Sequence, residues 1–312
     1  MNHRRYLAAL VSGALQLWMW SPVSLRAQSG TTATVTTATY ETREYRAENG
    51  RAIRITSLGN LVSLESPYGF DHINMGTYAR EGYVVSYDDP GPAQTRVLYN
   101  VNDLYSKTLG GSRDLMPNSF TGPPTGTTFP INTPVTAIVV VDTEDNVIRL
   151  THRFEWRAGL GRVTVTTTVT NRLTSPVLLR GFKRHADINV DGGGGYGNGG
   201  ALGAPGLNDW AHTTDGILAS VRCGGCPPTP PHPLTPETVS THVVFMSGIP
   251  APPFSILKSA TDNSELFSAG PVLKTARLGA RTNENNQVTL VWAGSALAPG
   301  AFRKFTTLYE VQ

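Results

Sequence analysis

The chain has 312 residues, and its 26 Lys and Arg against 23 Asp and Glu give a formal charge of +3 at neutral pH. Three of the basic residues, Arg4, Arg5 and Arg26, lie within the first 27 residues, which contain no acid, so the rest of the chain is formally neutral. Without a basic excess or a basic run, the composition argues against a nucleic-acid-binding protein.

Residues 1–27 are typical of an export signal peptide. Arg4 and Arg5 precede an apolar stretch from Tyr6 to Trp20, and Ala27 supplies a small residue for cleavage. The apolar stretch is too short for a permanent transmembrane helix. We therefore expect an exported protein, periplasmic or secreted, without a transmembrane segment after cleavage. An uncleaved membrane anchor is the alternative.

The first half of the mature chain consists of short alternating apolar runs. Residues 28–45 are Thr-rich, either a spacer or an edge strand, and we expect a single domain over 46–312. A hairpin is predicted around Gly59 and Asn60, and two further strands at 81–87 and 95–101. Residues 103–135 carry too many prolines for a central strand and are predicted to be a loop.

The strongest strand pattern lies between residues 135 and 190. Two strands are predicted on either side of the turn 143–146, and a third at 162–171. A fourth covers 175–190 with an interruption or bulge at Gly181. Successive strand side chains point to opposite sides, so one face of the second strand is apolar; its residues are Ile148, Leu150, His152, Phe154 and Trp156. On this face His152 is expected to be a buried, hydrogen-bonded histidine.

The last third of the chain is less regular. Residues 191–236 are rich in Gly and Pro and are expected to be irregular, while strands return at 241–248, 287–294 and 301–311. The segment 261–269 is the one candidate for a short helix, capped by Thr261 or Asp262. The prediction is an all-β fold: a large antiparallel two-sheet β-sandwich with long Gly/Pro-rich loops and little helix.

The two cysteines, Cys223 and Cys226, lie in the sequence RCGGCPPTPP. Export to an oxidising compartment favours a short-range disulfide between them. The prolines that follow prevent the helix that a thioredoxin-type redox pair needs, and two cysteines do not complete a zinc site. Free thiols are the alternative to the disulfide.

A glycine-rich segment, DINVDGGGGYGNGG, begins at residue 187. Asp187, Asn189, Asp191 and Gly192 match the opening of a calcium loop of the D-x-[DN]-x-[DN]-G kind. Alternate oxygen ligands converge on Ca²⁺ when the backbone curls around the ion. However, the twelfth position is Asn198 instead of a bidentate acid. A polar strand end followed by a surface loop is the alternative interpretation.

Two histidines lie next to carboxylates. His185 precedes Asp187 by two residues, and His72 follows Asp71. A histidine beside a carboxylate can act as a general acid or base; surface or structural roles are the alternative. The sequence contains no G-x-S-x-G, H-E-x-x-H or GxxxxGK[ST] motif.

Two stretches resemble galactose-mutarotase-type supersandwiches. TNRLTSPVLLRGFKRHADINVDG is similar to the segment in which a Thr-Asn strand end leads to a catalytic histidine, and LAPGAFRKFTTLYEV is similar to the last strand of that family. The resemblance implies that His185 donates a proton to a sugar ring oxygen. Arg184 replaces the asparagine usual before that histidine, and the earlier histidine-glycine motif is absent.

Two aromatic residues, Tyr196 and Trp210, are candidates for stacking on sugar rings. They also suit the filling of a sandwich end. The preferred interpretation is a secreted β-sandwich protein with an extracytoplasmic binding or structural role, with carbohydrate or a cell-envelope component as partner and Ca²⁺ as stabiliser. The alternative is a carbohydrate-active enzyme that uses His185 with Asp187 or Asp71.

Thermal unfolding with calcium and with a chelator tests the cation hypothesis. A ligand that binds only the folded state raises its stability, so millimolar Ca²⁺ is expected to raise the melting temperature. Replacing Asp187 and Asp191 with Ala is expected to abolish the increase. An unchanged midpoint of the parent protein in calcium would rule out the site.

Overall fold

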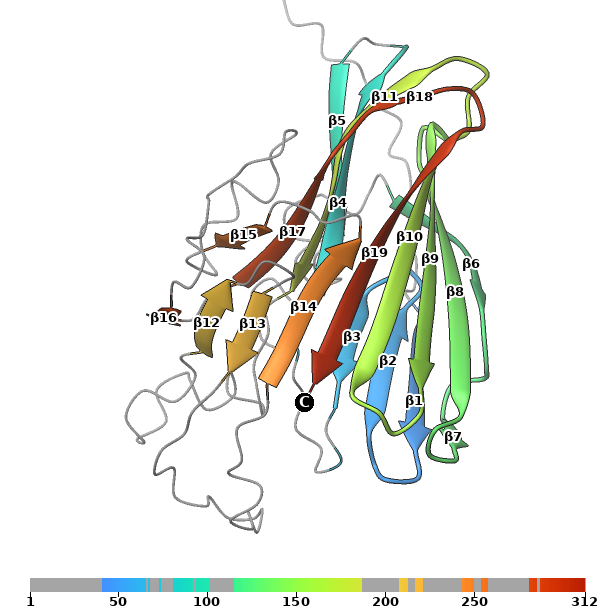
Figure 1. The fold of residues 1–312 in the computed structure, drawn as a ribbon. Coiled ribbons are helices and arrows are strands. Elements are labelled where there is room, and N and C mark those ends of the chain that lie inside the picture. The colour runs from blue at the N-terminus through green and yellow to red at the C-terminus, as the bar shows by residue number, and fades with distance from the viewer. Residues whose placement is uncertain are drawn as a thin grey trace, which may run out of the picture. The chain divides into compact units, whose positions relative to one another are not determined.

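The computed structural model describes nineteen strands and some of the segments that connect them. The described residues are 41–65, 67, 73, 81–91, 94–100, 115–186, 208–212, 217–220, 243–249, 254–257, 281–284 and 287–311. They belong to one compact unit, Tyr40–Gln312. All regular structure within them is β (Figure 1), and none of it is a helix that could cross a membrane.

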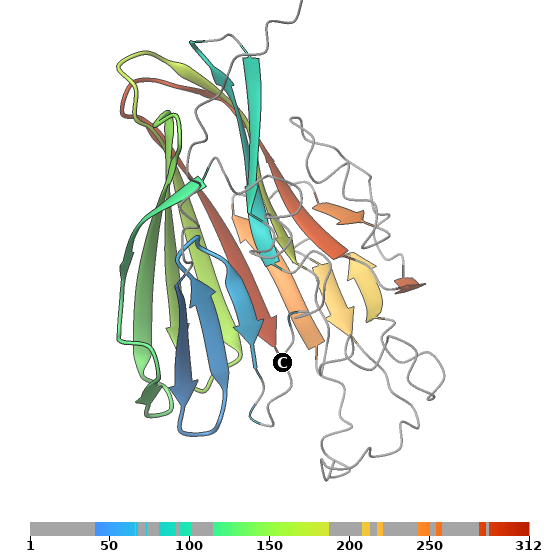
Figure 2. The same ribbon diagram turned by 180° about the vertical axis from the view of Figure 1, so that it is seen from behind.

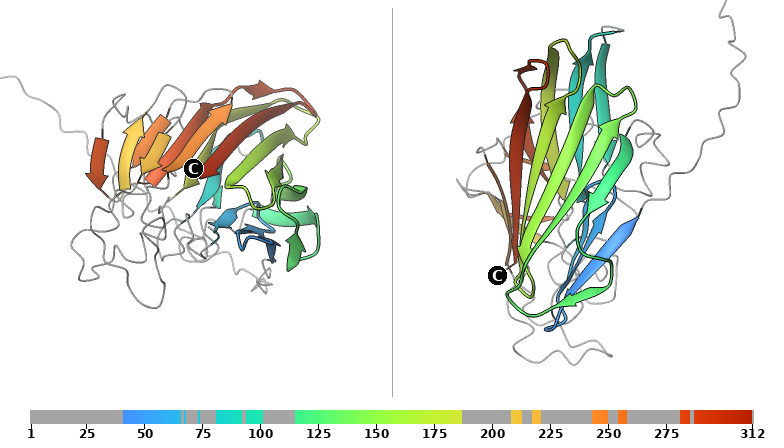
Figure 3. Two further views of the ribbon diagram at one scale, coloured as in Figure 1. Left: turned by 60° about the horizontal axis from the view of Figure 1, so that its bottom comes forward. Right: turned by 90° about the vertical axis from the view of Figure 1, so that its right-hand side faces the viewer.

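The largest sheet has nine strands in the order β16-β12-β13-β14-β19-β10-β9-β8-β6. Figure 3 shows β19, β10, β9 and β8 side by side in one curved layer. All its neighbours pair antiparallel. Its strands are β6 (Leu115–Thr121), β8 (Pro134–Thr143), β9 (Ile148–Arg157), β10 (Arg162–Asn171), β12 (Asn208–His212), β13 (Ile217–Ser220), β14 (Val243–Ile249), β16 (Arg281–Glu284) and β19 (Phe302–Val311).

A second sheet packs against the first, and a third, smaller one completes the fold. The second sheet has the order β15-β17-β11-β4-β5, with the short β18 paired to β11. The third has the order β3-β2-β1-β7, and its β1–β7 pair is parallel (Figure 2). Their strands are β1 (Thr42–Ala47), β2 (Ala52–Thr56), β3 (Leu61–Leu64), β4 (Glu81–Asp89), β5 (Gln94–Asn100), β7 (Thr127–Phe129), β11 (Val177–Ala186), β15 (Phe254–Leu257), β17 (Gln287–Ala293) and β18 (Ala296–Leu297).

The core forms where the inner faces of the sheets meet. On β9 the predicted apolar face is buried, including His152, whose Nδ1 lies 3.0 Å from the Thr167 hydroxyl oxygen. Burial lowers the pKa of His152 well below its usual value, and the Arg184 charge adds to this effect. The rings of Phe182 and Phe305 stack at 4.9 Å and join the six-stranded sheet to the nine-stranded one. Tyr45 packs on Trp156 at 5.3 Å and attaches the small sheet.

Two of the connections between the large sheets, β10–β11 and β17–β19, lie next to each other (Figure 1). Asn171 holds the two crossovers together. Its buried side-chain amide donates to the carbonyl oxygens of Ser175, Leu297 and Ala298, at 2.8 to 3.2 Å. The Thr-Asn strand end noted in the sequence therefore has a structural task, because it satisfies backbone acceptors where the chain changes sheets.

Most predicted strands are confirmed, and two predicted loops are wrong in part. Within 103–135 the structure forms β6 and β7; β6 is an edge strand, with a register shift at Pro117 that removes the need for a regular ladder there. Within 191–236 it forms β12 and β13. The bulge at Gly181 is confirmed by a register shift. The predicted helix at 261–269 lies outside the described residues.

The predicted hairpin between β2 and β3 is confirmed, and its turn enters the core. Gly59 has φ +83°, a conformation that side-chain-bearing residues rarely adopt. A Cβ added there would lie 2.2 Å from a ring carbon of His152. The turn therefore requires glycine for two reasons, the backbone conformation and the contact with the imidazole.

Gly59→Ala is expected to lower the free energy of unfolding by about 2–5 kcal/mol, about 1–2 from the positive φ and about 1–3 from overpacking. Gly126→Ala is the matched control, because Gly126 has φ +78° with no atom within 4 Å of its Cβ position. It should cost only the backbone penalty of about 1–2 kcal/mol. Equal losses in urea denaturation of the two variants would contradict the packing role of Gly59.

Candidate functional site

Strand β11 is the central strand of the six-stranded sheet and carries polar side chains on both faces. Arg184 points into the space between the sheets, where its Nε lies 3.4 Å from the Tyr309 hydroxyl of β19. Because side chains alternate along a strand, Lys183 and His185 point to the opposite, outer face of the sheet. Lys183 and His185, two residues of a possible site, thus lie on the opposite face of β11 from the core side chain Arg184.

His185 is held in place by the neighbouring strand β17. Its Nδ1 lies 2.9 Å from the hydroxyl oxygen of Thr289, its cross-strand partner. On the other side its partner is Gly82 of β4, which contributes no side chain. His185 is fully buried. The hydrogen bond fixes the orientation of the imidazole, as catalytic and ligand-binding histidines require.

Lys183 lies two residues before His185 on the same outer face. Its cross-strand partners are Val84 and Val291, and the next strand places the half-buried Tyr99 opposite Val84. Only 3% of Lys183 is exposed. Lysine is rarely buried to this degree outside ion pairs or functional sites. The outer face around β11 therefore combines an ammonium group, an imidazole, a hydroxyl and an aromatic ring, and we call Lys183, His185, Thr289 and Tyr99 the outer-face cluster.

On the inner face, Arg184 forms a fully buried ion pair with Glu81 of β4. The carboxylate also accepts hydrogen bonds from the Tyr309 hydroxyl and from the backbone N–H of Leu61, both at 2.7 Å. Arg184 donates a further bond to the carbonyl oxygen of Gly59, at 3.1 Å. One network thus joins β4, β11, β19 and the β2–β3 turn.

Burial raises the pKa of the Glu81 carboxyl, while the charge of Arg184 and the bonds from Tyr309 and Leu61 oppose the rise. Burial and the negative charge of Glu81 also raise the pKa of the Tyr309 hydroxyl well above its usual value, so this group stays protonated and donates. In this network Tyr309 and Arg184 donate hydrogen bonds and Glu81 accepts them. The network fixes the position of β11, the strand that carries Lys183 and His185 of the outer-face cluster.

The structure places few of the residues predicted from the sequence. His185 is the one predicted catalytic residue that it describes. Trp210 lies on β12 of the nine-stranded sheet, whereas His185 lies on the six-stranded one. The others lie outside the described residues: Asp71, His72, Asp187, Asn189, Asp191, Tyr196, Cys223 and Cys226. Within the described part, no three His, Cys, Asp or Glu side chains are grouped to hold a metal ion.

Sequence reasoning missed Lys183, Thr289 and Tyr99 as partners of His185, and Glu81 as the partner of Arg184. The signal for Lys183 was its spacing of two from His185, which puts both on one face of a strand. The signal for Glu81 was a carboxylate in register with Tyr83, Val85 and Tyr87 on an apolar face. Arg184, which departs from the mutarotase pattern, is explained by this inward-facing ion pair.

Comparison with protein-family models and with curated protein sequences finds no match. Among solved structures, a bacterial glucoamylase complexed with acarbose is 9% identical at a TM-score of 0.48, with 86% of this chain and 32% of the glucoamylase chain covered. A galactose mutarotase-like protein from Lactobacillus casei is 13% identical (TM-score 0.43; 88% and 100% covered). A second one, from Clostridium acetobutylicum, is 8% identical (0.42; 85% and 93%). All three TM-scores lie below 0.5.

Glu81→Ala is expected to lower the free energy of unfolding by about 3–5 kcal/mol, because it leaves the guanidinium of Arg184 buried without its counter-charge. The double variant Glu81→Leu/Arg184→Met removes both charges and should recover much of this loss. Glu155→Ala is the surface control, because its ion pair with Arg153 is exposed, and it should change stability by less than about 1 kcal/mol. Chemical denaturation measures all three; a double variant as unstable as Glu81→Ala would contradict the ion-pair argument.

Proposed function

We propose that the protein binds carbohydrate outside the cytoplasm, through a site built on the outer-face cluster. The observation that carries the proposal is the placement of Lys183 and His185 side by side on the outward face of β11, with His185 held by Thr289. Lysine and histidine side chains are rarely this buried on a sheet face unless they are paired or belong to a functional site.

The chemistry of the cluster suits sugar hydroxyls. An ammonium group donates hydrogen bonds, an imidazole donates and accepts, and a hydroxyl does both. Tyr99, on the same face, offers a ring on which an apolar sugar patch can stack. The resemblance of residues 170–192 and 297–311 to mutarotase-type supersandwiches supports the same ligand class. The export signal predicted at 1–27 would place such a protein among cell-envelope or external glycans.

Binding to mono- and oligosaccharides tests the proposal. Isothermal titration of the mature protein against a panel of neutral sugars should identify a ligand. Lys183→Met is expected to weaken its binding about tenfold, because a hydrogen bond from a charged group contributes about 1.5–3 kcal/mol. Lys304→Met is the control, since Lys304 is exposed on the nine-stranded sheet.

Circular dichroism must show that both variants are folded. A parent protein that binds none of the sugars would overturn the function, whereas equal affinities of the parent and Lys183→Met would overturn the site.

A second candidate function is proton transfer to a bound sugar. The hydrogen bond between His185 and Thr289 favours it, because a general acid or base must be held in one orientation. Polarimetry of freshly dissolved aldoses measures this activity directly. His185→Gln should then lower the rate of mutarotation about 100-fold while sugar binding persists. If the parent protein does not raise the rate of mutarotation above the uncatalysed rate, proton transfer is excluded and sugar binding is the remaining function.

A further inference from the structure

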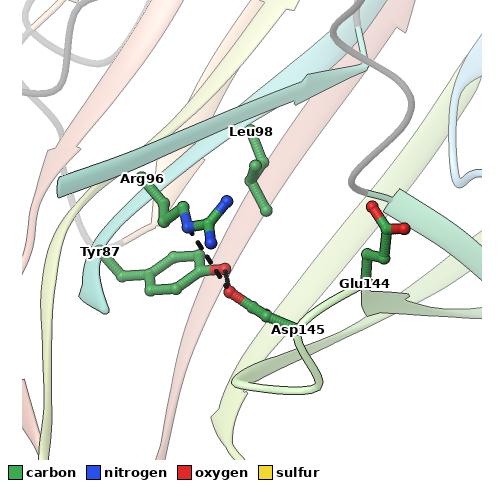
Figure 4. Close-up of a pocket in the computed structure, with 5 residues that line it drawn as sticks. All are labelled: Tyr87, Arg96, Leu98, Glu144 and Asp145. Atoms are coloured by element: carbon green, nitrogen blue, oxygen red, sulfur yellow. Dashed lines mark hydrogen bonds and ion pairs between the residues drawn. The ribbon is translucent and has the colours of Figure 1, made fainter. Parts of the chain in front are cut away.

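A cavity lies on the inner side of the six-stranded sheet, opposite the face that carries the outer-face cluster. It has a volume of about 170 Å³ and is lined by Tyr87, Arg96, Leu98, Glu144 and Asp145. Two of these residues belong to the β8–β9 turn and three to β4 and β5, so the cavity lies where the edge of one large sheet meets a turn of the other (Figure 4). We call it the turn pocket.

Asp145 forms a rigid polar wall of the turn pocket. Its carboxylate accepts hydrogen bonds from the Tyr87 hydroxyl and the Thr143 hydroxyl, both at 2.6 Å, and from the backbone N–H of Val147 at 3.0 Å. Burial raises the pKa of Tyr87, and its bond to Asp145 adds to this rise, so the phenol stays neutral. The wall is thus organised before any ligand arrives.

Arg96 and Glu144 supply polar groups that other described residues leave at least partly unpaired. The Arg96 Nε lies 3.3 Å from Asp89 and 3.9 Å from Asp145, but within the described part of the chain Nη1 and Nη2 make no hydrogen bond or ion pair. The Glu144 carboxylate is likewise without a described partner, and Figure 4 shows it across the cavity from Arg96 and Leu98. The Arg96 guanidinium and the Glu144 carboxylate thus lie on different sides of the cavity (Figure 4).

The size and charge of the turn pocket define the ligand class. A cavity of about 150 Å³ holds one benzene molecule, so the turn pocket has room for one six-membered ring, with some of the ring's substituents outside the cavity. Arg96 contributes one positive charge and Glu144 and Asp145 two negative ones, which disfavours an anionic ligand. A ring bearing several hydroxyls matches both sides, because each hydroxyl can accept from a guanidinium and donate to a carboxylate.

We propose that the turn pocket binds one neutral pyranose unit, with its hydroxyls between Arg96 and Glu144 and an apolar edge against Leu98. The turn pocket shares no lining residue with the outer-face cluster. Gly82, the partner of His185, precedes Tyr87 by five residues on β4, a separation of about 16 Å along the strand. The two sites also lie on opposite faces of the sheet.

Protein-observed NMR titration with methyl glycosides of D-glucose, D-galactose and D-mannose tests the proposal. At least one glycoside should shift signals of the 143–147 turn and of β5 in a saturable manner. Glu144→Gln is expected to weaken this binding about tenfold, since it replaces a charged acceptor by a neutral one. Glu48→Gln is the matched control, because Glu48 is also exposed and without a described side-chain partner.

Lys183→Met separates the turn pocket from the proposed outer-face site and should leave the affinity for the turn pocket unchanged. The proposal is overturned if no glycoside shifts the turn, if Glu144→Gln binds as tightly as the parent, or if Lys183→Met abolishes the shifts. L-serine at the same concentrations is the competing probe. Saturable shifts of the turn by serine and none by the glycosides would identify a zwitterion pocket instead of a sugar pocket.

Discussion

The buried ion pair between Glu81 and Arg184 is the interaction that organises the fold around the candidate site. Two buried charges require each other and further hydrogen-bond partners, or their burial would be strongly unfavourable. Those partners are Tyr309 of β19 and, in the β2–β3 hairpin, Leu61 and Gly59. The pair therefore fixes β4, β11, β19 and the β2–β3 turn relative to one another.

This constraint also decides which way β11 faces. A shift of register by one residue would move Arg184 out of reach of Glu81 and turn its neighbours to the other side of the sheet. Because Arg184 is committed to the interior, Lys183 and His185 must point outward. The bulge at Gly181 sets this alternation, and Asn171 anchors the strand's entry from β10. The outer-face cluster is thus a consequence of the inner network.

The six-stranded sheet presents different chemistry on its two faces and at its two ends. Near Gly82 and His185 the outer face carries the ammonium and imidazole groups of the cluster. Near Tyr87 the inner face opens into the turn pocket, where the loop that follows β8 supplies carboxylates. The first place is built from a cross-strand pair between distant segments, and the second from a tight turn with Asn146 at φ +57°. Rigid strands hold the polar groups at each.

The sequence by itself determined the all-β class, most of the long strands, the hairpin at Gly59 and the buried face of β9, because alternation and turn residues act locally. It did not determine which distant strands meet. The partnership of Glu81 with Arg184, the strand β6 among prolines and the third sheet all depend on contacts between segments far apart in the chain. Lys183, Thr289 and Tyr99 come together with His185 for the same reason: strand pairing, rather than sequence spacing, makes them neighbours.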